Sequence, residues 1–313
     1  MPMPRTVLVV NPQSKRGLLG RRWPELAAEI RRTYGPFEEA RTRCAGDATE
    51  LTRDALRAGA ERIIAMGGDG TINEVACGFF EDGERIAPNA ALGVLPFGTG
   101  GDFRKTLGMP KDLDAACEIL ARGNTRLLDA GKLSLLDPAN GRVDRIFINI
   151  ASFGMSGLVD ELVNQGSKRL GGTLSFMLAT ARASLRYKNQ RVRLVFDDDD
   201  GDPVDMMIHT VAVANGQYFG GGMRIAPDAD PGDGLFDVVA LGDMSRRDMM
   251  LRGHRVYAGS HLGLDKVSFR RARKVRAEPL DPDPIRLDVD GETPGILPAT
   301  FEVLPGAIHV ITP

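Results

Sequence analysis

The stretch RIIAMGGDGTINE, Arg62 to Glu74, decides the architecture of the first part of the chain. Its apolar run Arg62–Met66 has the length and composition of a short buried strand, and Thr71–Phe80 has helical spacing. The tetrad Gly67-Gly68-Asp69-Gly70 stands between them, so the sequence predicts a strand that enters a helix through a glycine-rich loop. Open α/β sheets bind ligands where strands end and helices begin, which makes this loop a predicted ligand site.

The same order of strand, loop and helix recurs on both sides of this stretch. Predicted strands are Thr6–Val10, Phe37–Arg43, Arg62–Met66 and Ala90–Leu95, and predicted helices are Trp23–Tyr34, Asp47–Ala58 and Thr71–Phe80. Asp47 is a plausible helix cap because its side chain can accept a hydrogen bond from the first turn. This alternation predicts a parallel sheet with helices on its faces.

The pattern changes after about residue 125, where strand-like runs dominate. These runs are Leu127–Leu136, Arg145–Ala151, Arg191–Phe196, Met206–Ala214, Leu235–Leu241, Lys266–Phe269, Ile285–Val289, Phe301–Leu304 and Ala307–Ile311. Helices are predicted at about Gly157–Val163, Leu174–Tyr187 and Ser245–Tyr257. The sequence therefore predicts two domains, an α/β domain over residues 1–128 and a β-rich domain over residues 129–313, whose last segment can pack back on the first domain.

Composition excludes several classes of protein. The 313 residues include 40 Lys and Arg against 42 Asp and Glu, a net charge of −2 that argues against a nucleic-acid partner. The three cysteines form no CxxC pair, and the four histidines show no zinc-binding spacing. No apolar run approaches the roughly 18 residues of a membrane span. A cytoplasmic protein is expected, and association with the surface of a membrane stays open.

Three glycine-rich or polar loops follow predicted strands: Asn11–Gly17, Gly67–Glu74 and Pro96–Phe103. Glycine lets backbone N–H groups approach phosphate oxygens closely, and a helix that begins behind the loop adds a favourable dipole. Hydroxyl, amide and lysine side chains, with an aspartate for Mg²⁺, complete the residue types that a nucleotide site needs. Each loop alone could be an ordinary tight turn, but three at successive strand ends favour a phosphate site. The GxxxxGK[ST] and GxGxxG motifs are absent, which argues against a P-loop NTPase and an ordinary dinucleotide-binding domain.

The continuation of the glycine tetrad into Thr71-Ile72-Asn73-Glu74-Val75 resembles the nucleotide loop of the diacylglycerol kinase catalytic-domain family, which includes sphingosine and ceramide kinases. NAD kinases and 6-phosphofructokinases share the tetrad alone. Further segments resemble the family's motifs in the same order: Asn11-Pro12-x-Ser14, Thr42 before Gly46-Asp47-Ala48, Pro96-x-Gly98-Thr99-x-x-Asp102-Phe103, Asn215-Gly216, Ala226-Pro227 through Asp233-Gly234-Leu235, and Asp290-Gly291-Glu292. The resemblance covers nearly the whole chain.

This resemblance implies a fold, a cofactor and a set of site residues. It implies an N-terminal α/β nucleotide domain of 6-phosphofructokinase type, a C-terminal β-sandwich-like domain, and an active site in the cleft between them. It implies that ATP is bound by Asn11, Pro12, Gln13, Ser14, Lys15, Thr42, Gly67, Gly68, Asp69, Gly70, Thr71, Ile72, Asn73, Glu74, Gly98 and Thr99. It also implies that Asp69 holds the catalytic Mg²⁺, that Asp230, Asp233 and the carbonyl of Leu235 hold a structural Mg²⁺, and that Glu292, beside Asp290, accepts the proton.

The family resemblance implies an ATP-dependent lipid kinase, with diacylglycerol favoured as the acceptor and phosphatidic acid as the product. Sphingosine or ceramide kinase, NAD kinase, and a binding protein without turnover are the alternatives. One departure is Gly101, where the family has asparagine, and it leaves the detail of that loop open. A lipid substrate at a membrane surface is the expected partner, and a homodimer is an open expectation. The basic stretch Arg270–Arg276 could contact anionic lipid or be a solvated edge strand.

Overall fold

The computed structural model describes residues 3–98, 100–137, 141–159, 183, 187–197 and 203–313. It divides the chain into two compact units: unit 1, Met1–Leu128 with Gly306–Pro313, and unit 2, Asp129–Pro305. The chain leaves unit 1 within strand β7 (Thr125–Asp137) and returns to it within strand β17 (Ala299–Ile311).

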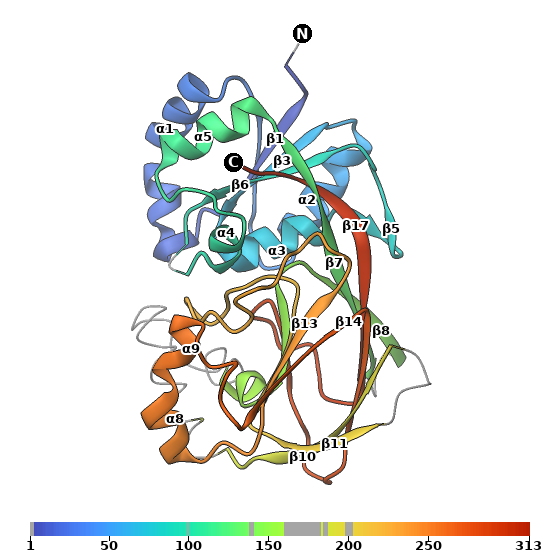
Figure 1. Ribbon diagram of the computed structural model, residues 1–313. Coiled ribbons are helices and arrows are strands. Elements are labelled where there is room, and N and C mark those ends of the chain that lie inside the picture. The colour runs from blue at the N-terminus through green and yellow to red at the C-terminus, as the bar shows by residue number, and fades with distance from the viewer. Residues whose placement is uncertain (1–2, 99, 138–140, 160–182, 184–186, 198–202) are drawn as a thin grey trace. The chain divides into compact units, whose positions relative to one another are not determined.

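Unit 1 is built on a parallel sheet whose strands run in the order β17, β6, β3, β1, β2. The strands are β1 (Thr6–Val10), β2 (Glu38–Arg41), β3 (Arg62–Gly67), β6 (Ala91–Pro96) and the last residues of β17, with a short hairpin of β4 (Phe80–Glu81) and β5 (Glu84–Arg85). The helices are α1 (Ser14–Thr33), α2 (Asp47–Arg57), α3 (Asp69–Cys77), α4 (Asp102–Thr106) and α5 (Leu113–Arg122). Helix α1 packs against α5, and α2 packs against α3 (Figure 1). The predicted α/β domain is confirmed.

The central strands of unit 1 are apolar apart from Thr6 and Arg62 at their starts, because helices cover both faces of the sheet. Leu8, Ile63, Ile64 and Leu92 have no exposed surface. In contrast, β2 at the edge of the sheet is polar and largely exposed.

The predicted capping role of Asp47 is wrong. Gly46 occupies the N-cap position of α2 with φ 83°, and no side chain caps this helix end. The carboxylate of Asp47 instead accepts hydrogen bonds from the backbone N–H of Arg43 (2.8 Å) and from its guanidinium (2.9 Å). These hydrogen bonds lower the pKa of Asp47 to about 2. The Asp47 side chain therefore forms an ion pair with Arg43, four residues earlier, instead of capping the helix.

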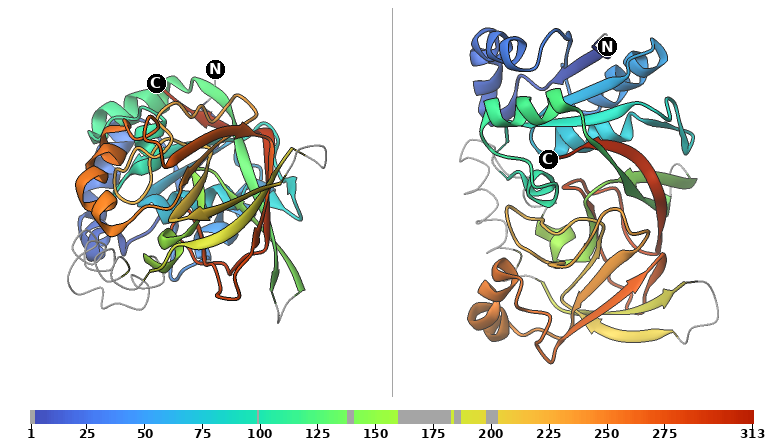
Figure 2. Two further views of the ribbon diagram at one scale, coloured as in Figure 1. Left: turned by 60° about the horizontal axis from the view of Figure 1, so that its bottom comes forward. Right: turned by 45° about the horizontal axis from the view of Figure 1, so that its top comes forward.

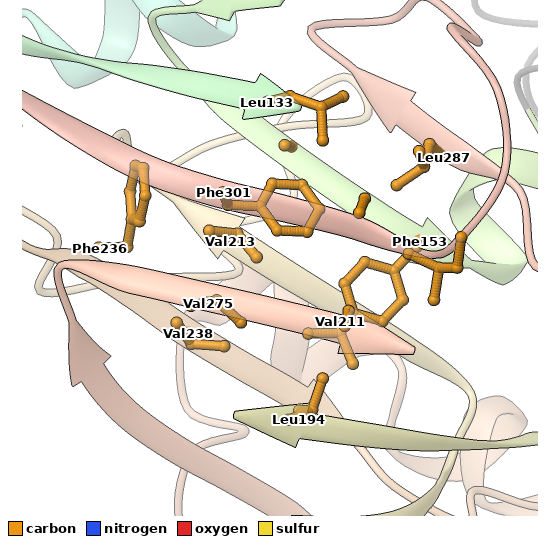
Figure 3. Close-up of a cluster of buried hydrophobic side chains, with 14 of the residues drawn as sticks. Leu133, Phe153, Leu194, Val211, Val213, Phe236, Val238, Val275, Leu287 and Phe301 are labelled. Atoms are coloured by element: carbon orange, nitrogen blue, oxygen red, sulfur yellow. The ribbon is translucent and has the colours of Figure 1, made fainter. Parts of the chain in front are cut away.

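Unit 2 contains two sheets that enclose one core. One sheet has the strand order β14, β13, β12, β9, β16, and the other runs β11, β10, β15, β17 with the pair β7 and β8. The remaining strands are β8 (Gly141–Phe147), β9 (Ile150–Gly154), β10 (Gln190–Phe196), β11 (Val204–Ile208), β12 (Thr210–Ala214), β13 (Phe236–Leu241), β14 (Val267–Ala272), β15 (Lys274–Pro279) and β16 (Leu287–Val289). Side chains from both sheets meet between them (Figure 3), where the rings of Phe153 and Phe301 stack with centroids 5.9 Å apart. This confirms the predicted β-sandwich-like domain.

Four predicted runs differ from the observed strands. Residues 145–151 and 206–214 each divide into two strands, because a turn separates β8 from β9 and another separates β11 from β12. Residues 299–311 form one strand, although the sequence predicts a break at Pro305-Gly306. Gly306 has φ 55°, a conformation that glycine adopts freely, and β17 pairs with β15 before this point and with β6 after it.

The predicted helix Ser245–Tyr257 is present as two short helices, α8 (Arg246–Arg252) and α9 (His254–Ala258), which meet at Gly253. The predicted helices at about Gly157–Val163 and Leu174–Tyr187 lie mostly outside the described residues, although residues 155–159 are helical. Within the described part of the chain, no helix is long and apolar enough to cross a membrane.

Candidate active site

The three predicted loops meet at one edge of the unit 1 sheet. Neighbouring strands place Val10 beside Met66, and Gly67 beside Pro96. Because β1, β3 and β6 are parallel, their carboxyl ends and the loops that follow lie together. The amide of Asn11 donates a hydrogen bond to the hydroxyl of Thr71 (3.0 Å), which joins the first loop to the second.

Two glycines let the second and third loops touch through their backbones. A Cβ atom on Gly98 would lie 2.7 Å from the Cα atom of Gly68, a distance at which one loop would have to move. Gly68 is also the N-cap of α3, and no side chain caps the first turn of this helix. Uncapped N–H groups and the dipole of a helix attract anions, so this end of α3 suits a phosphate group.

Asp69 begins α3, and its carboxylate joins the second loop to the third. Its two oxygens accept hydrogen bonds from the backbone N–H groups of Gly101 (2.8 Å) and Phe103 (3.3 Å). Burial, reinforced by the negative charge of Asp102, raises the pKa of Asp69. Lys105 partly balances this charge, because its ammonium group lies 2.8 Å from the Asp102 carboxylate. A cation that approached Asp69 would relieve the remaining repulsion.

The departure at Gly101 has a structural reason. Gly101 has φ 66° and forms the N-cap of α4 in the left-handed conformation. Glycine adopts this conformation without strain, and asparagine tolerates it better than most residues do. The backbone N–H that holds Asp69 is present with either residue, so the exchange preserves this contact.

The donors at Asp69 suit a magnesium ion that is bound together with a nucleotide. Magnesium prefers oxygen ligands and is usually held by one or two carboxylates and the phosphates of a substrate. Asp69 has two carboxylate oxygens with acceptor capacity beyond their two hydrogen bonds. The residues that the structure describes include no group of three or more His, Cys, Asp or Glu side chains that could hold a metal ion alone. The site therefore fits a metal that arrives with phosphate ligands.

The first loop has an unusual backbone. Lys15, Arg16 and Gly17 have φ angles of 49°, 60° and 76°, so three consecutive residues are left-handed and the regular turns of α1 begin after them. The ammonium group of Lys15 lies 4.7 Å from the ring centroid of Phe97, in the third loop. Non-glycine residues in this conformation are uncommon and are found mainly where the surroundings fix the backbone.

A cavity of about 370 Å³ opens beside these loops, wholly within unit 1. Its lining includes the backbone of Gly98 and Gly101 and is rich in cations. The cationic lining residues are Lys15, Arg22, Arg104 and Lys111. Glu29 and Asp112 also line it, so the lining carries four cationic and two anionic residues. The volume is that of a small-molecule site, and the excess of positive charge favours an anionic ligand. The sequence motifs identified Lys15, but no local pattern marks the other three.

The remaining residues predicted to bind the nucleotide are placed differently. Thr42 lies at the end of β2, where its backbone N–H donates to the carbonyl of Val10 (2.9 Å). Ile72 is 1% exposed and belongs to the core, whereas the Glu74 carboxylate accepts from the backbone N–H of Ala48 (3.3 Å). Ile72 and Glu74 therefore hold α3 in place rather than facing the loops. Thr99 lies outside the described residues.

In unit 2, Asp290-Gly291 forms the turn of a tight hairpin. Val289 and Glu292 exchange two backbone hydrogen bonds (2.8 and 2.9 Å) around these two residues, whose φ angles are 49° and 89°. Both central residues of a type I′ turn require positive φ, for which Asp-Gly is a preferred pair. The turn leaves the Glu292 side chain exposed.

The carboxylate of Asp290 is held by the backbone between β8 and β9. It accepts from the N–H groups of Ile150 (2.8 Å), Ile148 (3.0 Å) and Asn149 (3.4 Å). Burial raises the pKa of Asp290 to about 7, although these three hydrogen bonds oppose the shift. With its oxygens engaged in this way, Asp290 is better placed to position the hairpin that carries Glu292 than to act on a substrate itself.

Asp230 and Asp233 lie on one loop of unit 2, where each carboxylate has hydrogen-bond partners of its own. Asp230 accepts from the backbone N–H of Gly232 (3.1 Å), and Asp233 accepts from that of Leu235 (3.0 Å) and pairs with the guanidinium of Arg271. Asp129 also braces this loop, accepting from the N–H of Gly234 (2.7 Å). Asp129 lies 105 residues before Gly234, and no local pattern in the sequence indicates this contact. The Arg271 guanidinium thus already neutralises Asp233, so the structural Mg²⁺ stays a prediction.

Comparisons with known proteins agree with these features. Residues 5–133 match the model of the diacylglycerol kinase catalytic domain, and residues 149–312 match that of the YegS C-terminal NAD kinase beta sandwich-like domain. The diacylglycerol kinase of Bacillus subtilis is 29% identical to the chain and covers 99% of it and 97% of its own length. The diacylglycerol kinase of Mycobacterium tuberculosis is 29% identical, and the match covers 86% of this chain and 82% of that protein.

Solved structures show the same fold at lower identity. A diacylglycerol kinase from Bacillus anthracis has a TM-score of 0.70 at 19% identity and covers 100% of this chain and 98% of its own. An NAD kinase from Archaeoglobus fulgidus, in complex with ATP, has a TM-score of 0.50 at 13% identity. The match covers 98% of this chain and 93% of that one. Because the two matching models together span nearly the whole chain, the protein belongs to the diacylglycerol kinase catalytic-domain family and is a lipid kinase that uses ATP to phosphorylate a hydroxyl group.

Proposed function

We propose that the acceptor is diacylglycerol and that the product is phosphatidic acid. The meeting of Asn11, Gly68, Asp69 and Gly98 at one sheet edge, as a phosphate-binding site requires, supports the transfer of a phosphate group and does not by itself choose the acceptor. Relatives named diacylglycerol kinase that match along nearly the whole chain support the choice of lipid. Sphingosine, ceramide and NAD are the competing acceptors.

In the proposed reaction the chain binds the nucleotide and moves one proton. The N–H groups at the start of α3 and the close-packed Gly68 and Gly98 cradle the phosphates, and Asp69 would hold Mg²⁺. When bound, this ion supplies positive charge for the β- and γ-phosphates. The lipid oxygen forms a bond to the γ-phosphorus, the bond from that phosphorus to ADP breaks, and the hydroxyl proton passes to Glu292.

Transfer of labelled phosphate from ATP to a panel of lipids tests the acceptor. With Mg²⁺ and mixed micelles, we expect diacylglycerol to be labelled at least about tenfold faster than sphingosine, ceramide or phosphatidylglycerol. NAD and fructose 6-phosphate serve as soluble controls. Preferential labelling of sphingosine or ceramide would replace diacylglycerol as the substrate, and labelling of NAD alone would contradict the proposal.

Substitution of Gly98 tests the contact between the second and third loops. A methyl group in Gly98→Ala would lie 2.7 Å from Gly68 Cα, so the two loops must separate. We expect ATP binding to weaken by about tenfold or more, because crowding of this kind typically costs about 1–3 kcal/mol and each 1.4 kcal/mol is a factor of about ten in affinity. Calorimetric titration with ATP measures the change.

Gly263→Ala is the matched control, because a Cβ atom there would meet nothing within 4 Å. We expect its affinity for ATP to equal that of the wild type. If Gly98→Ala also bound ATP normally, the two loops would not need to touch for nucleotide binding.

A further inference from the structure

Helices α8 and α9 carry the most exposed large apolar side chains of the described part of the chain. Met250 is 83% exposed, Leu251 71% and Tyr257 56%, whereas the other exposed large apolar residues reach at most 46%. Figure 1 and the right-hand view of Figure 2 show both helices (orange) on the outside of unit 2. Contiguous exposed apolar residues on a soluble protein usually mark an interaction surface.

The two helices are firmly attached to unit 2, so this exposure does not come from a loose segment. Val256 of α9 and Met244, just before α8, are buried in one core cluster, against which Met249 of α8 packs. A capping box between Ser245 and Asp248 closes the start of α8. The carboxylate of Asp248 also pairs with Lys266, 2.8 Å away. The outer side is therefore presented on a fixed support.

Arginines accompany the apolar residues on the outer side. The segment contains Arg246, Arg247, Arg252 and Arg255, all exposed, and its one aspartate is the capping residue Asp248. On a helix, residues four apart are neighbours, so Arg247 lies beside Leu251 and Arg246 beside Met250. Within the described residues, Arg247, Arg252 and Arg255 form no ion pair.

The basic stretch Arg270–Arg276, a candidate lipid contact from the sequence, differs in this respect. The guanidinium of Arg270 lies over the ring of Phe196 (4.4 Å), and Arg271 pairs with Asp233 and Asp237. Arg276 lies 3.3 Å from the Glu278 carboxylate. Arg271 and Arg276 are thus already paired with carboxylates within the protein, whereas no carboxylate of the described residues pairs with Arg247, Arg252 or Arg255.

The α8–α9 face consists of Met250, Leu251, Tyr257, Arg247, Arg252 and Arg255. We propose that it docks the enzyme on an anionic phospholipid bilayer, an inference that rests on the proposed lipid substrate. The apolar side chains would enter the boundary between headgroups and acyl chains, and the arginines would contact lipid phosphates. An anionic bilayer binds protein surfaces that combine apolar side chains with neighbouring basic ones.

A second copy of the chain fits this face less well. A two-fold interface brings the same patch of both copies together, so the arginines of one copy would face those of the other. The face is also joined to the loop that resembles a later family motif, since the backbone N–H of Arg224 donates to the carbonyl of Val256 (3.0 Å). Docking would therefore hold this loop of unit 2 at the membrane surface.

Vesicle co-sedimentation of the full chain, without nucleotide, tests the proposal. The probes are phosphatidylcholine vesicles and the same vesicles with phosphatidylglycerol, each at low and high salt. We expect the wild type to prefer the anionic vesicles and to bind them more weakly at high salt. The double variant Met250→Ser/Leu251→Ser should bind at least about tenfold more weakly, because it loses most of the inserted apolar surface.

Two further variants complete the experiment. Val204→Ser/Met207→Ser removes two other exposed apolar side chains (39% and 37%) from β11 and should bind like the wild type. Arg247→Gln/Arg252→Gln/Arg255→Gln should lose about fivefold in binding for each arginine and much of the salt dependence. Circular dichroism and thermal unfolding confirm that every variant is folded.

Unchanged anionic-vesicle binding of Met250→Ser/Leu251→Ser overturns the proposal, and so does a wild type that binds no vesicles. A wild-type dimer that the double variant dissociates, with vesicle binding retained, would assign the face to a second copy instead. Phosphorylation of a dispersed short-chain diacylglycerol, without vesicles, is measured separately. If the wild type did not phosphorylate this soluble lipid, the proposed substrate would be wrong. The vesicle-binding result would still decide the docking proposal by itself.

Discussion

Replacement of Asp69 by asparagine is expected to lower kcat for phosphate transfer by about a thousandfold while leaving unit 1 folded. The carboxylate is the candidate ligand for the ion that neutralises the phosphates, and phosphoryl transfer depends mainly on such charge stabilisation. An asparagine oxygen can still accept the shorter hydrogen bond, from the Gly101 N–H (2.8 Å from the carboxylate), and only the longer one from the Phe103 N–H (3.3 Å) is lost. The loss should therefore be one of charge rather than of loop structure.

The same transfer assay, run at several Mg²⁺ concentrations, measures the effect of Asp69→Asn. Asp54→Asn is the matched control in the same unit, because its side chain is 75% exposed and pairs only at the surface with Arg57 (3.3 Å). The control should retain full activity. Turnover of Asp69→Asn within a few-fold of the wild type would remove Asp69 from the catalytic site.

The second large effect is expected at Asp290, and it concerns stability. Truncation to alanine leaves the buried N–H groups of Ile148, Asn149 and Ile150 without their acceptor. Each lost acceptor of this kind costs on the order of 1 kcal/mol, so we expect Asp290→Ala to lower the free energy of unfolding by about 3 kcal/mol. Urea unfolding followed by circular dichroism at pH 5, below the pKa of about 7, measures this loss, because above that pKa the buried negative charge of the wild type destabilises the fold and offsets it.

Hydrogen exchange should also quicken at Ile148–Ile150 in the Asp290→Ala variant. Asp283→Ala, at an exposed position of the same unit, is the control and should leave the free energy of unfolding nearly unchanged. A variant Asp290→Ala that unfolds like the wild type would show that these three hydrogen bonds contribute little to stability.

Glu292→Gln is the companion variant, and we expect it to lower activity without changing stability. The side chain is exposed beyond the hairpin turn, so the free energy of unfolding should not change. If Glu292 accepts the proton, kcat should fall by about a hundredfold or more, because general-base catalysis typically contributes that much. Normal turnover of Glu292→Gln would assign the proton to another group.

Local signals account for what could be predicted from the sequence. The buried strands of unit 1 are short apolar runs, and the loops at Asn11, Gly67 and Pro96 consist of residues whose backbone preferences are local. Because β1, β3 and β6 are neighbouring parallel strands, the three loops that follow them must lie at the same edge of the sheet. In contrast, β15 was missed, because Arg276 and its charged neighbours obscure the inward-facing Val275 and Ala277.

Long-range pairs account for what could not be predicted. The Asp290 carboxylate fixes the turn between β8 and β9 from 140 residues further along the chain, and Arg271 reaches Asp233 across 38 residues. Neither pair has a local signature. The left-handed backbone of Lys15 and Arg16 likewise departs from the preference of both residues and is set by the loop's surroundings.

The split of unit 1 between residues 1–128 and 306–313 affects the order in which the chain can mature during synthesis. Strand β17 covers one side of β6, pairing His309 with Ala91 and Val310 with Leu92, and it leaves the ribosome only after all of unit 2. Until then β6 is an open edge, the kind of template on which chains associate wrongly. A translation product that stops before residue 306 would therefore carry all three loops of the candidate site yet present an unprotected sheet edge, which we expect quality control to recognise.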